Sequence, residues 1–221
     1  MIVFLDGVNL DEIAELWEAG LIDGVTTNPS LIAKSGREMN KTIYDICKIL
    51  EWKGHVSAEV LAIDYSNMLL ESEKLTQIAE NVVIKLPATA HGLRACKTLY
   101  DKGVKVNMTL CFSPMQALLA ARAGAYYISA FVGRVEDAGY SGEEMLRNIA
   151  SIYDNYDYST KILSTSVRSM NHIQLSALLG ADAITVPYNL ITSMIKHPLT
   201  DKGLEMFLSD WKKFEGQAAH L

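Results

Sequence analysis

The run Val82-Val83-Ile84-Lys85-Leu86-Pro87 places a charged side chain inside an otherwise apolar segment. A short apolar, β-branched run of this kind is typical of a strand buried on both faces, as in a parallel sheet covered by helices. Because side chains alternate along a strand, Val83, Lys85 and Pro87 share one side, which in a closed barrel is the interior. Burying an unpaired ammonium group costs several kcal/mol, so a lysine at this position needs a reason.

One reason for such a lysine is chemical. A desolvated lysine near other cations has a pKa lowered from about 10.4 towards about 7–8, and the neutral amine attacks carbonyl carbons. Two simpler interpretations of Lys85 stay open at this point. Its side chain extends to solvent at the end of the strand, or it pairs with a carboxylate in the core.

Length and composition predict a single domain without a membrane segment. The chain has 221 residues, of which 49% are hydrophobic, and this suits one α/β barrel over residues 1–221. No apolar stretch is long enough to cross a bilayer, and the N-terminal MIVFLDG lacks the features of a signal peptide. We therefore expect a cytoplasmic protein with no membrane partner.

Charge and cysteine content argue against other classes of protein. The formal net charge of −6 argues against nucleic acid as a partner. Cys47, Cys96 and Cys111 are odd in number and have no CxxC spacing, and the histidines show no ligand spacing. Neither a disulfide framework nor a metal site is expected.

Strand-like segments alternate with helix-like segments along the chain, which is the pattern of βαβ units and a parallel sheet. Eight such units predict a (β/α)8 barrel. Helix starts are marked by Ser113 before Pro114 and by Ser141 three residues before Glu144. A further helix at about residues 201–216 either covers its own barrel or docks on a neighbouring subunit. The predicted strands are Ile2–Asp6, Gly24–Asn28, His55–Leu61, Val82–Pro87, Lys105–Leu110, Tyr126–Gly133, Lys161–Val167 and Ala183–Pro187.

Polar residues gather near the ends of these predicted strands, where the active site of such a barrel lies. Within each strand they are two residues apart, so each pair faces the same side, and Phe131 shares the side of Ser129. A polar interior around one lysine is costly to fold and indicates a preorganised site. We expect Thr26 and Asn28 to contact a substrate. The polar positions are Asp6, Thr26, Asn28, Ser57, Glu59, Asn107, Thr109, Ser129, Ser164 and Ser166.

The residue types are suited to breaking a carbon–carbon bond. The amine of Lys85 can form a Schiff base with a ketone, and the protonated imine withdraws electrons from the adjacent bond. Asp6 could take the proton from a substrate hydroxyl, while Glu59, through a water held by Thr109, could move protons to and from the lysine adduct. The alternatives are a turn carboxylate for Asp6 and a plain ion pair with Lys85 for Glu59.

Two further sets of side chains are candidates for substrate contacts. Asn28 and Asn107 could hold hydroxyl groups of the substrate. Arg134, Ser166 and Arg168 would lie together if the sixth and seventh strands are neighbours. Two guanidinium groups and a hydroxyl at a barrel mouth suit a phosphate, because arginine matches phosphate oxygens in a bidentate way. Ordinary solvated surface charge is the alternative for the arginines.

The candidate residues lie in the segments FLDG with Asp6, GVTTNPS at 24–30, Glu59, VIKLP with Lys85, NMTL at 107–110, SAFVGR at 129–134 and STSVR at 164–168. Taken in order, these motifs resemble those of the transaldolase family, and more narrowly its short-chain branch, which includes the fructose-6-phosphate aldolases. The resemblance covers essentially the whole chain. It implies a (β/α)8 barrel, a Schiff base on Lys85, and transfer of a dihydroxyacetone unit between sugar phosphates without a cofactor. It also implies a homo-oligomer, commonly a pentamer or decamer.

The resemblance also implies a role for each matching position. Lys85 matches the Schiff-base lysine, Asp6 the aspartate base, and Glu59 the acid/base glutamate. Gly7 departs from the family, whose members more often have a small hydroxyl residue there. The positions matching polar substrate or water contacts are Asn28, Asn107, Thr109 and Ser129, and those matching the phosphate site are Arg134, Ser166 and Arg168.

Glu59 and Phe131 bear on the choice within the family. True transaldolases resemble this chain at both positions, whereas fructose-6-phosphate aldolases typically have Gln and Tyr. A tyrosine hydroxyl could help to protonate the enamine and release free dihydroxyacetone, while phenylalanine leaves the unit for an aldehyde acceptor. The favoured function is therefore a transaldolase, the first alternative is an aldolase that releases dihydroxyacetone, and the second is a barrel that binds sugar phosphates without chemistry.

Overall fold

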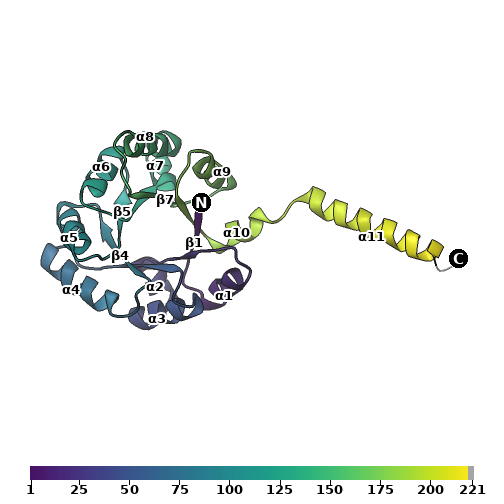
Figure 1. The fold of residues 1–221 in the computed structure, drawn as a ribbon, viewed down its shortest axis with the longest axis horizontal. Helices are drawn as coiled ribbons and strands as arrows, with labels where there is room; N and C mark the ends of the chain where they lie inside the picture. The colour runs from purple at the N-terminus through teal and green to yellow at the C-terminus, as the bar shows by residue number, and fades with distance from the viewer. Residues whose placement is uncertain (219–221) are drawn as a thin grey trace. The chain divides into compact units, whose positions relative to one another are not determined.

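A computed structural model describes residues 1–218 of the chain, with side chains described as far as residue 215. Its main feature is a closed barrel of parallel strands with helices around the outside (Figure 1). Each strand pairs with the next in sequence, and the last pairs with the first, so the predicted (β/α)8 barrel is confirmed. The strands are β1 Ile2–Asp6, β2 Gly24–Thr26, β3 His55–Glu59, β4 Val82–Pro87, β5 Val106–Cys111, β6 Tyr127–Phe131, β7 Lys161–Thr165 and β8 Ala183–Val186.

Helices follow the strands in the order expected of βα units. The predicted caps are confirmed, because Ser113 Oγ accepts the backbone N–H of Gln116 and Ser141 Oγ accepts that of Glu144. The helices are α1 Leu10–Glu18, α2 Pro29–Ser35, α3 Met39–Ile49, α4 Tyr65–Thr76, α5 Ala90–Asp101, α6 Pro114–Arg122, α7 Val132–Asp137, α8 Gly142–Asn155, α9 Met170–Leu178, α10 Tyr188–Met194 and α11 Pro198–Ala218.

The strand boundaries differ from the predicted ones mainly at the carboxyl ends. β1 and β4 have the predicted bounds, but β2, β3, β6, β7 and β8 stop earlier than predicted. β5 and β6 begin one residue later than predicted, and β5 also ends one residue later. The largest difference is in β6, where Val132 and Gly133 belong to α7. Only glycine at position 133 lets this helix pass so close to the end of β7, because a Cβ there would lie 2.2 Å from the carbonyl oxygen of Ser166. Arg134 is therefore a helical residue.

The lower interior of the barrel, at the amino ends of the strands, is apolar. Phe4, Val83, Tyr127, Leu163 and Ala183 form a buried cluster there. The rings of Phe4 and Tyr127 meet edge to face, with centroids 5.7 Å apart. Val83 therefore faces inward as predicted, and alternation places Lys85 on the same side, one layer higher.

Strand register sets a row of polar residues above this cluster. Lys85 lies opposite Glu59 on β3 and opposite Asn107 on β5. Asp6 lies opposite Thr26 across the β1–β2 pair. Side chains from neighbouring strands are thereby brought to one height, at the carboxyl end of the barrel.

The chain divides into two compact units, Met1–Tyr188 and Asn189–Leu221. The first contains the barrel, and the second contains the predicted C-terminal helix, which begins at Pro198 and is described as far as Ala218. A single domain over the whole chain stays a prediction.

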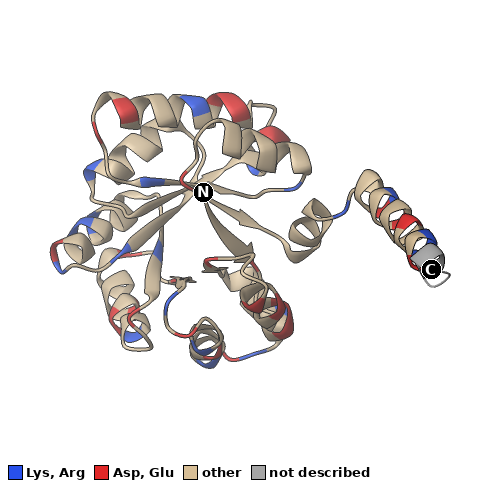
Figure 2. Ribbon diagram, turned by 45° about the vertical axis from the view of Figure 1, so that its right-hand side comes forward, with Lys and Arg blue, Asp and Glu red and all other residues tan. Residues whose placement is uncertain are grey.

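Charged residues lie mainly on helices and loops (Figure 2). Four strands carry one charged residue each, and it is the first or last residue of the strand except in β4. Lys85 is an exception within a buried strand. Among residues 1–218, no helix is both long and apolar enough to cross a membrane.

Candidate active site

Lys85 is a buried cation with two defined partners. Its side chain is 8% exposed, and its Nζ lies 3.0 Å from Glu59 Oε2. The same Nζ donates a hydrogen bond to the carbonyl oxygen of Thr27 at 3.0 Å. The lysine therefore does not extend to solvent, and the partner carboxylate that offsets part of its desolvation is Glu59.

Asp6, at the end of β1, is a second carboxylate close to this lysine. Burial raises the pKa of Asp6 above its ordinary value, although the positive charge of Lys85 and a hydrogen bond from Thr26 both act to lower it. Thr26 Oγ1 lies 3.4 Å from Asp6 Oδ1 and 2.6 Å from Thr185 Oγ1. Asp6 is thus a partly desolvated carboxylate that holds a proton more tightly than an exposed aspartate.

A small polar cavity of about 120 Å³ lies at this end of the barrel. Eight of the predicted site residues line it, and so do two threonines that the sequence analysis did not single out. The lining residues are Asp6, Thr26, Asn28, Lys85, Ser129, Phe131, Arg134, Ser166, Thr165 and Thr185.

The other four predicted residues are not part of this lining. Glu59 contacts Lys85 directly. Asn107 is fully buried in a chain of hydrogen bonds, in which it donates to Ser57 Oγ at 3.2 Å and accepts from Ser129 Oγ at 2.7 Å. Thr109 Oγ1 is buried and has no hydrogen-bond partner among the groups that the structure describes. The fourth residue is Arg168.

The three residues predicted to hold a phosphate lie on two adjacent segments at the rim. Arg134, on α7, lines the cavity with its guanidinium carbon 5.1 Å from the centre of the Phe131 ring. Ser166, just after β7, also lines the cavity and has a left-handed backbone with φ of 60°. Arg168 is exposed, and its Nη1 lies 2.6 Å from Asp137 Oδ1.

The prediction for the inward side of strand seven was wrong at Ser164. Its hydroxyl accepts a hydrogen bond from Ser176 on α9 at 2.8 Å, so Ser164 faces the helices. Leu163 and Thr165 face the interior instead. Ser166 reaches the cavity because it follows the end of the strand in a left-handed conformation, which interrupts the alternation.

Sequence reasoning missed Thr165 and Thr185 as cavity residues. Threonine is common in strands because it is β-branched, so neither residue stood out from its strand. The alternation signal could have identified Thr185, since it is two residues from the inward-facing Ala183.

Larger hollows lie between helices away from this site. One of about 300 Å³ is lined by residues that include Tyr100, Tyr126 and Lys105, on the side of the amino ends of β5 and β6. The 120 Å³ cavity differs because side chains from six strands converge on it, among them a lysine and a carboxylate. Within residues 1–218, no group of three or more His, Cys, Asp or Glu side chains could hold a metal ion.

The fold and the cavity together define a (β/α)8 barrel whose polar side chains meet at the carboxyl ends of the strands, where such barrels carry their active sites. The sequence model of the transaldolase/fructose-6-phosphate aldolase family matches residues 3–218. The chain belongs to this family.

Similar proteins agree with this assignment. The chain is 54% identical over 210 residues to a probable transaldolase of Chelativorans sp. (strain BNC1), and 55% identical over 210 residues to a probable transaldolase of Brucella anthropi. It is 52% identical over 210 residues to a probable transaldolase of Bartonella quintana. Each comparison covers 95% of this chain and 96% of the relative.

Proposed function

We propose that the protein is a transaldolase in which Lys85 forms a Schiff base with a ketose phosphate. The observation that supports this most strongly is the buried Lys85 ammonium, 3.0 Å from Glu59, in a cavity that Asp6 also lines. A barrel with a purely structural role would be better served by an apolar residue, since a buried ion pair is often no more stable than apolar packing. A barrel that only binds sugar phosphates is therefore disfavoured.

The first half of the reaction joins the substrate to the lysine. The neutral amine of Lys85 attacks the ketone carbon to give a carbinolamine, which loses water and leaves a protonated imine. Glu59 is within hydrogen-bond distance of Nζ and moves the protons that these steps require. The buried Thr109 hydroxyl, which has no partner among the described protein groups, holds the water that relays them.

The second half breaks a carbon–carbon bond. Asp6 removes the proton from the hydroxyl on the carbon beyond the bond, that carbon leaves as an aldehyde, and the electron pair moves into the iminium to give an enamine on Lys85. The raised pKa of Asp6 suits it to this base role, because a carboxylate that holds a proton more tightly is a stronger base. Asn28, Asn107 and Ser129 hold the hydroxyl groups of the substrate.

Phe131 favours transfer over release of the three-carbon unit. Its ring packs against Phe112 with centroids 5.4 Å apart and lies beneath the guanidinium of Arg134. Phe131 provides no hydroxyl to protonate the enamine, so the enamine persists until an aldehyde acceptor binds. The reaction is sedoheptulose 7-phosphate plus glyceraldehyde 3-phosphate giving erythrose 4-phosphate plus fructose 6-phosphate, as in the pentose phosphate pathway. The names of the relatives support the same choice.

We propose that the protein is a cytoplasmic homo-oligomer, a pentamer or decamer, and apolar side chains on α11 support the association of copies. The described helix exposes Leu204, Phe207, Leu208, Trp211 and Phe214, each by more than half. Single exposed apolar residues are ordinary, but a series of them on one helix is typical of an interaction site. Analytical ultracentrifugation tests this, and a monomer at micromolar concentration would contradict it.

The activity is tested by incubating the protein with fructose 6-phosphate and following glyceraldehyde 3-phosphate over many turnovers, with and without erythrose 4-phosphate. We expect sustained product only when the acceptor is present. Sustained product without the acceptor would mean that the protein is an aldolase that releases free dihydroxyacetone.

A further inference from the structure

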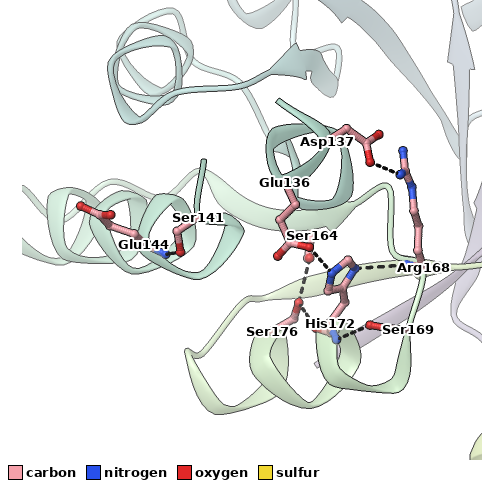
Figure 3. A network of polar contacts seen from close by, with 9 residues as sticks. All are labelled: Glu136, Asp137, Ser141, Glu144, Ser164, Arg168, Ser169, His172 and Ser176. Carbon is pink, nitrogen blue, oxygen red and sulfur yellow. Dashed lines mark hydrogen bonds and ion pairs between the residues drawn. The ribbon is translucent and has the colours of Figure 1, made fainter. Parts of the chain in front are cut away.

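A network of polar contacts surrounds Arg168, one of the two arginines of the rim (Figure 3). At its centre is His172, in the first turn of α9, with a side chain that is only 9% exposed. Its Nδ1 accepts the backbone N–H of Arg168 at 3.2 Å, and its Nε2 lies 2.8 Å from Glu136 Oε2. Because Nδ1 is an acceptor, the ring proton is on Nε2 and points at the carboxylate. Glu136 thereby selects the tautomer that can hold Arg168.

The segment that His172 contacts, Ser166–Arg168, has an unusual backbone conformation. Ser166 has φ of 60°, a conformation that costs free energy for a residue other than glycine. Its carbonyl oxygen is so close to Gly133 that a Cβ at position 133 would lie 2.2 Å away. Ser169 closes the segment by accepting the backbone N–H of His172 at 3.2 Å. A strained segment of this kind persists only where neighbouring contacts fix it.

Helix α7 also holds the side chain of Arg168. Asp137 accepts from its Nη1 at 2.6 Å, and this hydrogen bond lowers the pKa of the Asp137 carboxyl. The helix therefore fixes Arg168 in two ways: the backbone through Glu136 and His172, and the guanidinium through Asp137. It also carries Arg134, the other cation of the rim.

We propose that His172, oriented by Glu136, is a positioning residue that fixes the Ser166–Arg168 segment for binding the phosphate group of a substrate. The proposal rests on the proposed function, because it assumes that Ser166, Arg168 and Arg134 bind a phosphate monoester. His172 itself has no contact with the substrate. Its loss moves Ser166 and the start of the Arg168 side chain away from Arg134, so the phosphate loses affinity while the reacting carbon keeps its environment.

The test compares a phosphorylated with a non-phosphorylated ketose, fructose 6-phosphate and fructose, using erythrose 4-phosphate as the acceptor. In His172→Phe the ring stays but the acceptor for Arg168 is lost, and we expect KM for fructose 6-phosphate to rise about tenfold with kcat within about threefold of the original. KM for fructose stays unchanged. His172→Asn can again present an oxygen where Nδ1 lies, and restores KM for fructose 6-phosphate to within about threefold.

Three further variants complete the test, and the first of them keeps it decisive if the phenylalanine variant does not fold. Glu136→Ala, at a partly exposed position, should raise KM for fructose 6-phosphate in the same selective way. Glu143→Gln removes the 2.5 Å ion pair with Arg147 on α8 and should change neither KM. Arg168→Gln is the positive control for loss of phosphate affinity.

The outcomes separate this proposal from the proposed function. If unmodified protein forms no borohydride-trapped adduct with fructose 6-phosphate, the proposed function fails and the positioning role fails with it. If the adduct forms but His172→Phe and Glu136→Ala raise KM equally for both ketoses, or lower kcat for both, His172 is a structural residue. An asparagine variant no better than phenylalanine would overturn the role of Nδ1.

Discussion

The two ends of the barrel interior use the same strands but differ in their polar groups. At the amino ends, Phe4, Val83 and Leu163 pack without polar partners. At the carboxyl ends, Lys85 and Asp6 line a cavity, two residues further along the same strands. The amino end stabilises the fold by burying apolar surface, and this offsets the desolvation cost of the charged groups above it.

Each end contains a partly buried ionisable group with a shifted pKa, and the two groups can be compared. Burial lowers the pKa of His55 to about 4, with help from Lys105 and Lys161, and His55 Nδ1 lies 3.0 Å from the hydroxyl of Tyr127. Burial raises the pKa of Asp6. Both shifts favour the neutral form, but only Asp6 lines the cavity with Lys85. A perturbed pKa alone therefore does not identify an active site.

The largest expected effect is the loss of transfer in Lys85→Met. The variant keeps an unbranched side chain but has no amine, so we expect kcat for dihydroxyacetone transfer to fall by at least about 10⁴-fold. Lys105→Met, near the amino end, is the matched control and should retain activity. Transfer by Lys85→Met at a tenth of the original rate would contradict the proposal that the carboxyl end of the barrel carries the chemistry and the amino end stabilises the fold.

Asp6→Asn should reduce kcat by about 10²- to 10⁴-fold, because a general base is lost. Its stability should change in the opposite direction. The native protein binds the Asp6 proton more tightly than the unfolded chain, so ionised Asp6 costs stability above its ordinary pKa of about 3.9. At pH 7 the variant should therefore melt at a higher temperature than the original protein, and the difference should shrink as pH falls towards about 4 and be absent below it. A lower melting temperature at pH 7 would contradict this.

Leu163→Ala, at the amino end, should lower stability and leave activity unchanged, the reverse of the effect expected for Asp6→Asn. Deleting a fully buried leucine side chain costs about 2–5 kcal/mol of unfolding free energy. Urea unfolding measures this loss, while kcat per folded molecule should stay within about twofold, because Leu163 does not line the cavity. A large fall in kcat for the folded variant would show that the two ends are not separable.

The lowered pKa of His55 predicts that the stability of the protein depends on pH through this residue, while kcat does not. The unfolded chain binds a proton near pH 6.5, whereas native His55 does so only near pH 4, so stability falls as pH decreases between these values. In His55→Gln this part of the slope should be absent, and the pH profile of kcat should be unchanged. Thermal melts from pH 7 to pH 4 measure the slope, and equal slopes would contradict the prediction.

The smallest expected effect is in Phe131→Tyr, at the rim of the cavity. A hydroxyl near the enamine should raise release of glyceraldehyde 3-phosphate without an acceptor by about three- to tenfold. Phe112→Tyr, on the neighbouring ring, is the control. No gain in acceptor-independent cleavage would mean that residue 131 does not decide between transfer and release.

The alternation of strand-like and helix-like segments predicted the barrel. The alternation of side chains within a strand, which has a period of two, predicted the inward side of most strands. The charge of Lys85 in a buried strand was the basis for placing the candidate site, and its catalytic role stays a prediction. The rule failed at Ser164, whose outward hydroxyl is satisfied by Ser176 on α9. Such a partner comes from tertiary packing and leaves no signal in the strand itself.

The rim was harder to predict than the interior. Ser166 is left-handed, β6 passes directly into α7, and Gly133 of that helix lies against the carbonyl oxygen of Ser166. His172 was not recognised at all, because its neighbours Glu136 and Arg168 meet it only in the fold. Contacts between the segments that follow two different strands do not follow from the hydrophobic period of either segment.

The most direct test of the central claim is borohydride reduction of the protein in the presence of fructose 6-phosphate, followed by peptide mass analysis. The account predicts a stable three-carbon adduct on the peptide that contains Lys85, and no such adduct in Lys85→Met. An adduct on another lysine, or transfer activity with no trapped adduct on Lys85, would contradict it.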